Sequence, residues 1–383
     1  MALLLFRVAL PPLGRLARRT LSLFSHPSPS DWSKVVSDAE KIVGYPTSFM
    51  SLRCLLSDEL SHVAMHVRRL AGTKHPLLNT ARGFVQDSRN NLQTRGLVVL
   101  LMSKAAGPSG ASTCFPQQDM VSGIYPSQRS LAEITELIHT AFLVHRGIVD
   151  LKDWSSSDGP LKDMQFGNKM AVLSGDFLLA NACTGLAQLN NTKVVELISS
   201  AIGDLVQGIY CESSSAAEES SVTEDTTMDS WEERTFLSHG ALLAKSCKAA
   251  MELANHNAEA QGLAFLYGKH MSLAHKINSD LQPFVKGSAS DLMTFSLNCA
   301  PVVFHRQLVG SERWVHQLQQ ARSTGEHTDY TQLWKAIKAD EGVSSTVELC
   351  RYHGNKALSA IKWFPPSDAR SALENIASAV TKL

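Results

Sequence analysis

Three kinds of signal are missing from this 383-residue sequence. Lysine and arginine balance aspartate and glutamate at a formal net charge of zero, which removes the electrostatic basis for a nucleic-acid partner. No uninterrupted apolar run approaches the roughly 20 residues of a transmembrane span. The alternation of apolar and polar residues that is typical of strands is hard to find. These absences favour a soluble, helical domain.

Cysteine usage argues against a disulfide-stapled protein. The seven cysteines are an odd number, and no two form a Cys-x-x-Cys pair. Most of them lie in apolar segments of helical pattern, so we predict buried, reduced thiols in a reducing compartment. They are Cys54, Cys114, Cys183, Cys211, Cys247, Cys299 and Cys350.

The first 30 residues contain four arginines and no acidic residue. This composition is typical of a mitochondrial transit peptide. A secretory signal is the weaker alternative, because arginines interrupt the short apolar run and no Ala-x-Ala-like cleavage site follows it. We therefore predict a mitochondrial matrix protein with a transit peptide at 1–30 and one folded domain at 31–383.

Helical periodicity dominates that domain. It predicts helices from Asp31 to Gly44, over the apolar run 94–106, and at 311–320 and 330–340. The stretch 130–181 holds two further long helices with polar groups beside an apolar stripe. We expect the first of these two helices to begin with a capping box of Ser130 and Glu133.

An acidic segment interrupts the pattern at 212–233, where eight acids occur among Ser and Thr with no base. We predict a solvated, mobile loop here. A featureless insertion is the simpler interpretation, and a regulatory or partner-docking role is the alternative.

Two segments in 130–181 resemble the trans-prenyl diphosphate synthases. LIHTAFLVHRGIVD (137–150) is similar to the pattern LIHxASLxHDDVxD, and GNKMAVLSGDFLL (167–179) is similar to GxxxAxLxGDxL. The resemblance extends over 32–383. It implies an all-α fold, an isoprenoid-synthase-type helical bundle around a central cavity.

The positions that carry chemistry in that family differ here. HRGIVD retains His145 and Asp150 but has Arg146 and Gly147 where the family has its first two aspartates. The second aspartate-rich motif is reduced to Asp280. The remaining altered positions are Ser279 and Pro283 in that motif, and Arg95, Ser238 and His239 where the family binds diphosphates. Pro283 should also end or kink its helix.

The resemblance implies ionisation of an allylic diphosphate by Mg²⁺ held between two carboxylate clusters. Magnesium needs several oxygen ligands, whereas this chain has one carboxylate per cluster, with Arg146 beside the first. We therefore predict no catalytic residue and no metal ligand.

Arg146 could form an i,i+4 salt bridge with Asp150 or reach toward a partner's substrate. Asp176 is expected either in a polar network near the cavity or as a buried, hydrogen-bonded acid.

The family further implies a non-catalytic or regulatory subunit of a heteromeric trans-polyprenyl diphosphate synthase that makes the ubiquinone side chain. Its partner, a catalytic subunit 1, would hold the Mg²⁺, and a heterotetramer with two copies of each chain is an extrapolation. Three alternatives stay open: a weakly active synthase with unusual metal ligands, a stand-alone prenyl-chain or lipid-binding module, and a terpene-cyclase-like lyase. The lyase is disfavoured because it needs the same metal carboxylates.

Overall fold

The computed structural model describes residues 31–45, 73–78, 94–109, 120–217, 227–285, 296–322 and 331–382. The proposed transit peptide, Cys54 and Cys114 lie outside these residues. Within them the chain forms helices and two isolated bridge residues, Val121 and Ile124. The prediction of an all-α fold is confirmed.

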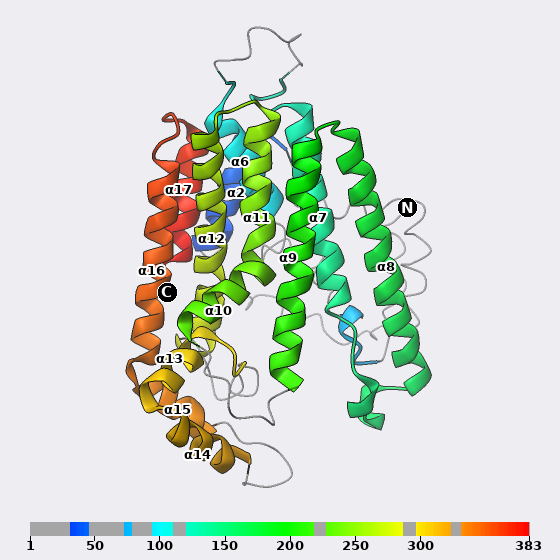
Figure 1. Cartoon of the computed structure of the whole chain (residues 1–383), viewed down its shortest axis with the longest axis vertical. Coiled ribbons are helices and arrows are strands. Elements are labelled where there is room, and N and C mark those ends of the chain that lie inside the picture. Colours follow the sequence, from blue (N-terminus) through cyan, green and yellow to red (C-terminus); the bar gives the residue numbers. More distant parts are fainter. Residues whose placement is uncertain are drawn as a thin grey trace, which may run out of the picture.

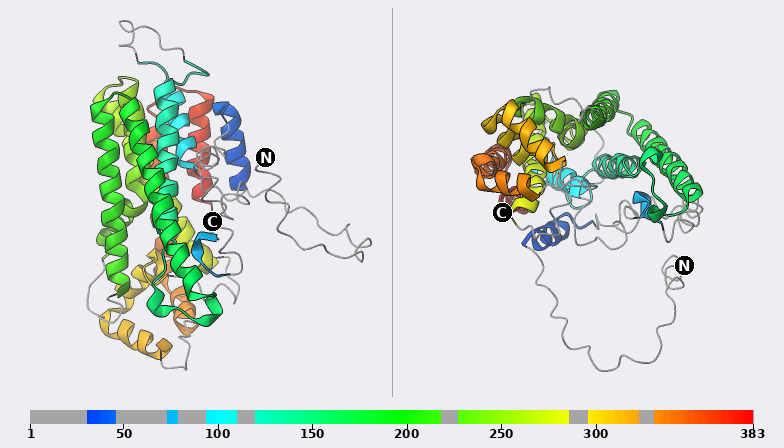
Figure 2. Two further views of the ribbon diagram at one scale, coloured as in Figure 1. Left: turned by 90° about the vertical axis from the view of Figure 1, so that its right-hand side faces the viewer. Right: turned by 90° about the horizontal axis from the view of Figure 1, so that it is seen from below.

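The helices form an elongated bundle (Figures 1 and 2). In chain order the α-helices of its first half are α2 (Asp31–Val43), α6 (Thr94–Ala106), α7 (Pro126–His145), α8 (Leu161–Gln188) and α9 (Thr192–Ala217). Two 3₁₀ turns, η5 (Leu151–Asp153) and η6 (Ser156–Asp158), join α7 to α8. The second half contains α10 (Met228–Thr235), the π-helical turn η8 (Phe236–Gly240), α11 (Ala241–Leu253), α12 (Ala258–Val285), α13 (Ala300–Val309), α14 (Ser311–Arg322), α15 (Thr331–Ala339), α16 (Glu341–Ile361) and α17 (Asp368–Val380).

Helix α6 is the centre of the core. Its predicted range is confirmed, and nine of its 13 residues are buried, from Gly96 to Ala105. A helix that is apolar on every side must be enclosed by others, and α2, α7, α11 and α17 all pack against it. At its carboxyl end Lys104 Nζ donates a hydrogen bond of 2.6 Å to Ile42 O, which ties α6 to the end of α2.

A smaller apolar cluster lies at the lower end of the bundle, where α13, α14 and α15 gather (Figure 1). His305 is buried there, with Nδ1 2.7 Å from Asp340 Oδ2 and Nε2 2.9 Å from Gln317 Oε1. The cluster consists of Phe284, Cys299, Val302, Trp314, Leu318, Leu333 and Ile337. Because Phe284 belongs to α12, this end of the molecule is joined to the main bundle.

Three local predictions need correction. Helix α7 begins at Pro126, not at Ser130, because Gln128 Oε1 accepts a 3.1 Å hydrogen bond from Tyr125 N. Glu133 is inside the helix and accepts from Tyr45 Oη at 2.5 Å. The acidic segment is shorter than predicted, since α9 reaches Ala217 and α10 begins at Met228; residues 218–226 lie outside the described structure.

The thiol prediction is correct for three cysteines and wrong for one. Cys247, Cys299 and Cys350 are free and buried, and burial raises the pKa of each. Cys183 is free but exposed, because it lies on the outer face of α8. Cys211 is half-buried and also free.

Helices α11 and α12 approach so closely that only glycine fits at their contact. A Cβ on Gly268 would lie 2.7 Å from Ala244 Cα and 2.9 Å from Leu243 O, which are backbone atoms that cannot move alone. We expect Gly268→Ala to lower the free energy of unfolding by about 1–3 kcal/mol through overpacking. Urea unfolding checks this.

The matched control is Gly262→Ala on the same helix, where a Cβ would meet no atom within 4 Å. Removing an exposed helical glycine should stabilise the chain by about 0.5–1 kcal/mol. If Gly268→Ala were stabilising as well, helix propensity and not the α11–α12 contact would govern position 268.

Candidate functional site

The first eroded motif does not form a continuous helical turn. Helix α7 ends at His145, and residues 146–150 make the turn that follows. Asp150 is exposed, and its Oδ1 accepts a 2.9 Å hydrogen bond from Lys152 N. Arg146 and Asp150 therefore do not lie on one face of a helix, which the predicted i,i+4 pairing requires.

Gly147 has a packing reason. A Cβ at this buried position would lie 3.1 Å from Val144 O and 3.5 Å from Leu77 N. A side chain at this position would require the neighbouring backbone to shift by a few tenths of an ångström.

His145 contacts the second long helix instead of the cavity. Its Nε2 lies 3.2 Å from Val172 O and 3.3 Å from Asp176 Oδ1. The ring lies over Gly175, where a Cβ would be 2.1 Å from the imidazole. Asp176 has a side chain that is 63% exposed, so it is neither the buried acid nor the cavity residue that the sequence suggested.

In the second eroded motif, Asp280 is buried and paired within the chain. Asp280 forms an ion pair with Lys276 one turn earlier on α12, and its Oδ2 accepts a 3.1 Å hydrogen bond from Ala300 N. Ser279 beside it is exposed. Pro283 lies inside α12, whose described residues run to Val285, and it cannot donate a hydrogen bond to the carbonyl of Ser279 four residues earlier.

Arg95 lies at the start of α6 and faces α7. Its Nη1 is 2.8 Å from His139 Nε2. Because arginine stays protonated and can only donate, His139 accepts through Nε2 and carries its proton on Nδ1. One turn before His139, Glu136 Oε1 accepts a 2.7 Å hydrogen bond from Gly96 N. Burial raises the pKa of Glu136 to about 7, against the lowering effects of that hydrogen bond and of Arg95.

Ser238 and His239 lie in the π-helical turn η8, an irregularity that often occurs at functional sites. Ser238 Oγ is 3.0 Å from Arg234 O and 2.7 Å from His239 Nδ1. Helix α9 comes so close that a Cβ on Gly208 would lie 2.5 Å from Ser238 N. This contact fixes the turn, and with it the direction of His239.

Three histidines from three different elements are influenced by the same cations. Burial first, and then the charges of Arg95 and Arg146, hold the pKa of His139 well below its usual value. Burial, Arg146, Lys276 and Arg95, in that order, do the same for His239. Burial, Arg95 and Lys276 lower the pKa of His275 to about 4. We call Arg95, Arg146, Lys276, His139, His239 and His275 the cationic cluster.

The structure therefore brings together Arg95, Arg146 and His239 of the predicted positions, with Asp280 tied to Lys276 at the edge of the cluster. It leaves out Asp150, Ser279 and His145. Glu136 and His139 were not among the predicted positions. They lie ten and seven residues before Arg146, in a mostly apolar helix. That spacing, close to whole turns, places polar groups on one face and could have revealed them.

These side chains do not fit Mg²⁺. The ion requires an octahedron of hard oxygen ligands, whereas Asp280 is engaged with Lys276 and Asp150 caps an exposed turn. Three cations at the cluster would also repel a divalent metal. In the part of the chain that the structure describes, no three His, Cys, Asp or Glu side chains are grouped so as to hold a metal.

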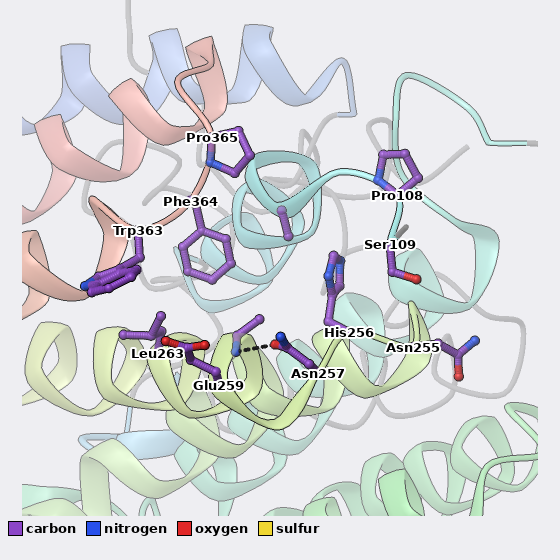
Figure 3. Close-up of a pocket in the computed structure, with 12 residues that line it drawn as sticks. Pro108, Ser109, Asn255, His256, Asn257, Glu259, Leu263, Trp363, Phe364 and Pro365 are labelled. Atoms are coloured by element: carbon purple, nitrogen blue, oxygen red, sulfur yellow. Dashed lines mark hydrogen bonds between the residues drawn. The ribbon is translucent and has the colours of Figure 1, made fainter. Parts of the chain in front are cut away.

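A separate pocket of about 510 Å³ lies elsewhere, between the end of α6, the start of α12 and the α16–α17 turn (Figure 3). Trp363, Phe364 and Leu263 supply its apolar wall, and Glu259 and His256 its polar wall. His256 Nε2 is bound to Gly107 O at 3.0 Å. None of the sequence-predicted site residues lines this pocket.

Helix α8 and residues Thr192–Cys211 of α9 are long and apolar enough, by length and composition, to cross a membrane. Polar residues interrupt both segments, so neither is an uninterrupted apolar run. Only 33% and 28% of their most apolar windows are buried in the bundle. A core helix of a soluble protein can give the same signal.

Comparison with known proteins identifies the chain's relatives. The family described as polyprenyl synthetase matches residues 88–291. The chain is 67% identical over 358 residues to the human protein named All trans-polyprenyl-diphosphate synthase PDSS2, covering 94% of this chain and 89% of that protein. It is 30% identical over 429 residues to the probable mitochondrial hexaprenyl pyrophosphate synthase of Neurospora crassa, covering 96% and 92%.

Solved structures agree with these relatives. An Arabidopsis medium/long-chain prenyl pyrophosphate synthase is 28% identical, with a TM-score of 0.57 and coverage of 86% of this chain and 98% of that one. A decaprenyl diphosphate synthase from Rhodobacter capsulatus has a TM-score of 0.61 and 18% sequence identity, and the match covers 90% of this chain and 99% of that one. At this identity the likeness shows the fold alone. The bundle thus has the isoprenoid-synthase fold. The chain belongs to the polyprenyl synthetase family, a family of prenyl-transferring enzymes.

The raised pKa of Glu136 makes a testable stability signature. In the unfolded chain this carboxyl ionises near its usual pKa of 4.5, whereas in the folded chain it holds its proton until about pH 7. Ionisation therefore favours the unfolded state as pH rises through this window. Relative to Glu136→Gln, we expect the wild-type free energy of unfolding to fall by up to about 3 kcal/mol between pH 4.5 and 8.

Urea unfolding of both proteins across that pH range measures the difference, because histidine titration is common to both and cancels. The glutamine can still accept from Gly96 N, so the hydrogen bond of 2.7 Å is retained. A difference in stability that does not change with pH would contradict the raised pKa.

Proposed function

We propose that this chain is the non-catalytic, regulatory subunit of a heteromeric trans-polyprenyl diphosphate synthase in the mitochondrial matrix. The complex would elongate an allylic diphosphate with isopentenyl diphosphate to make the ubiquinone side chain. The observation that carries the proposal is Asp280, the one acid of the second motif, held by Lys276 and by Ala300 N. A carboxylate that already accepts from a lysine and a backbone N–H has fewer lone pairs left for Mg²⁺, and the lysine charge beside it opposes a divalent cation.

The position of the other altered groups supports the same proposal. Arg146 stands where the family pattern has an aspartate, Gly147 is closely surrounded by backbone atoms, and Asp150 caps an exposed turn. Ionising a diphosphate needs positive charge on the leaving oxygens and a site to hold the metals. The proposed partner, a catalytic subunit 1, would supply that site together with its Mg²⁺.

An unusually apolar outer surface supports a partner chain. Helix α8 lies at the right-hand edge of the bundle in Figure 1 and faces the viewer in the left view of Figure 2. It exposes Val172 and Leu173, and the neighbouring α9 exposes Val206 and Tyr210, the last at 76%. Exposed apolar patches of this kind mark protein interfaces. A heterotetramer with two copies of each subunit is the assembly we propose.

Mitochondrial location is proposed from the arginine-rich start of the chain and from the relatives. Fungal proteins at 30% and 27% identity are named mitochondrial hexaprenyl pyrophosphate synthases. The alternative of a lone lipid-binding module would use the same apolar α8–α9 surface, so a direct test of partnership is required.

The test of the function is reconstitution of the enzyme. We expect the purified chain alone to incorporate no isopentenyl diphosphate into an allylic primer with Mg²⁺ present, because its carboxylates are committed elsewhere. Co-expression with the catalytic subunit should give long-chain polyprenyl diphosphate, which radiolabelled product analysis detects. Robust elongation by the isolated chain would contradict the proposal, as would undiminished product from the catalytic subunit without this chain.

The interface has a separate test. Leu173→Asp places a charge in the centre of the proposed contact, where desolvation is costly. We expect co-purification with the catalytic subunit to fall at least about tenfold, equivalent to 1.4 kcal/mol. The matched control is Leu308→Asp on α13, since Leu308 is 52% exposed and Leu173 is 51% exposed. Equal effects of the two substitutions would show that α8 is not the interface.

A further inference from the structure

The pocket at the start of α12 is remote from the altered positions on the same helices. Glu259 on its wall precedes Asp280 on α12 by 21 residues, a separation of about 30 Å at 1.5 Å per residue. Ala106 on another wall follows Arg95 on α6 by 11 residues, which corresponds to about 16 Å. The pocket volume of about 510 Å³ lies in the range of small-molecule sites.

The apolar wall of the pocket is held in place before any ligand binds. Trp363 and Phe364 come from the α16–α17 turn and face Leu263 on α12 (Figure 3). Phe364 is 5% exposed, and its carbonyl oxygen accepts a 2.8 Å hydrogen bond from Arg370 Nη1. Trp363, next to this anchored residue, is 72% exposed. A large aromatic surface on a fixed turn can bind a ligand without being ordered first.

The polar groups of the pocket are suited to a ligand that donates hydrogen bonds. Gly107 O can only accept, so its 3.0 Å hydrogen bond with His256 places the proton of that ring on Nε2. Burial lowers the pKa of His256, so the ring is neutral at pH 7 and its Nδ1 is an acceptor. Glu259 has an exposed carboxylate that pairs with no described residue. Ser109 Oγ is buried and has no hydrogen-bond partner among the described residues.

Helix ends add to the negative potential of the pocket. Three carboxyl ends lie at it, because Ala106 is the last residue of α6, and Asn255 and Trp363 each follow the end of a helix, α11 and α16, by two residues. Each carboxyl end carries about half a negative charge and favours a cation. The amino ends of α12 and α17 oppose them, but each has an acid in its first turn, Glu259 and Asp368. The sum of these charges is negative.

We propose that this pocket binds a small organic cation, an ammonium group on an apolar body. The ammonium would lie over the ring of Trp363, whose electron-rich face attracts a cation, and would donate a charge-assisted hydrogen bond to Glu259. The apolar body would pack on Phe364 and Leu263. No lysine or arginine is among the described lining residues, so a phosphate or a carboxylate finds no opposite charge there. The ligand is opposite in charge to the diphosphates in the names of the relatives, so this site goes beyond the proposed function.

Fluorine NMR of the full-length chain labelled with 5-fluorotryptophan tests the proposal. The chain has six tryptophans, and the signal that is missing from Trp363→Phe identifies Trp363. The probes are phenethylammonium, 2-phenylethanol and 3-phenylpropanoate, which share a phenyl ring and differ in charge. We expect phenethylammonium to shift the Trp363 signal saturably, with a dissociation constant at least about tenfold lower than that of either other probe.

A matched pair of substitutions tests the role of the carboxylate. Glu259→Gln removes the charge and keeps the volume, so phenethylammonium should bind at least about tenfold more weakly and 2-phenylethanol equally well. The control is Glu312→Gln, because Glu312 is also an exposed acid at the second position of its helix, α14, at the lower end of the bundle. The control should leave both affinities unchanged. Thermal unfolding shows that each variant is folded, as expected for substitutions at exposed positions.

Three results would overturn the proposal. A Trp363 signal that phenethylammonium does not shift, up to the solubility limit of the probe, would show that the pocket takes no such ligand. Equal affinity for phenethylammonium and 2-phenylethanol, or tighter binding of 3-phenylpropanoate, would show that the pocket does not select a cation. Affinity for phenethylammonium that is the same in Glu259→Gln and in the wild type would place the cation elsewhere. None of these results bears on the reconstitution test of the proposed function, because that test measures product from the complex.

Discussion

The ion pair between Lys276 and Asp280 is the interaction on which the interpretation of this protein depends. It joins two residues one turn apart on α12, and the same carboxylate accepts from Ala300 N at the start of α13. Removing one partner of a buried pair leaves an uncompensated charge, which is costly. Asp280 thus connects the main bundle to the small lower cluster around Phe284. In this chain the acid at this position of the family motif joins α12 to α13.

Once that carboxylate is neutralised, the electrostatics of the interior change sign. Facing carboxylates would attract cations, whereas Arg95 and Arg146 here lower the pKa of His139 and of His239 behind the effect of burial. The histidines are consequently neutral at pH 7, and burial raises the pKa of Glu136 to about 7. The pairing of Asp280 on α12, together with the charges of Arg95 and Arg146, accounts for the poor fit to magnesium.

The sequence predicted the scaffold well, because burial leaves a strong periodic signal. Helix α6 has the predicted range 94–106, and α2 ends at Val43, immediately before Gly44 with its φ of +69°. The motif alignment also identified Arg95 and Asp280 as altered positions. It could not give the path of residues 146–150 or the π-helical turn, since both follow from tertiary contacts. The backbone around Val144 crowds the position of a Cβ at Gly147, and the approach of Gly208 fixes Ser238.

The glycine contacts show that the spacing of these helices does not depend on a metal. Gly208 against Ser238 and Gly268 against Ala244 each hold two elements at a backbone distance that leaves no room for a Cβ, and Gly175 lies directly under the ring of His145. None of these contacts uses a carboxylate or a metal. Interior packing resists even small volume changes. The spacing of the helices is therefore set by these glycine contacts and by the buried, mostly apolar α6. The side chains facing the cluster are free to differ in charge, because the helix spacing does not depend on them.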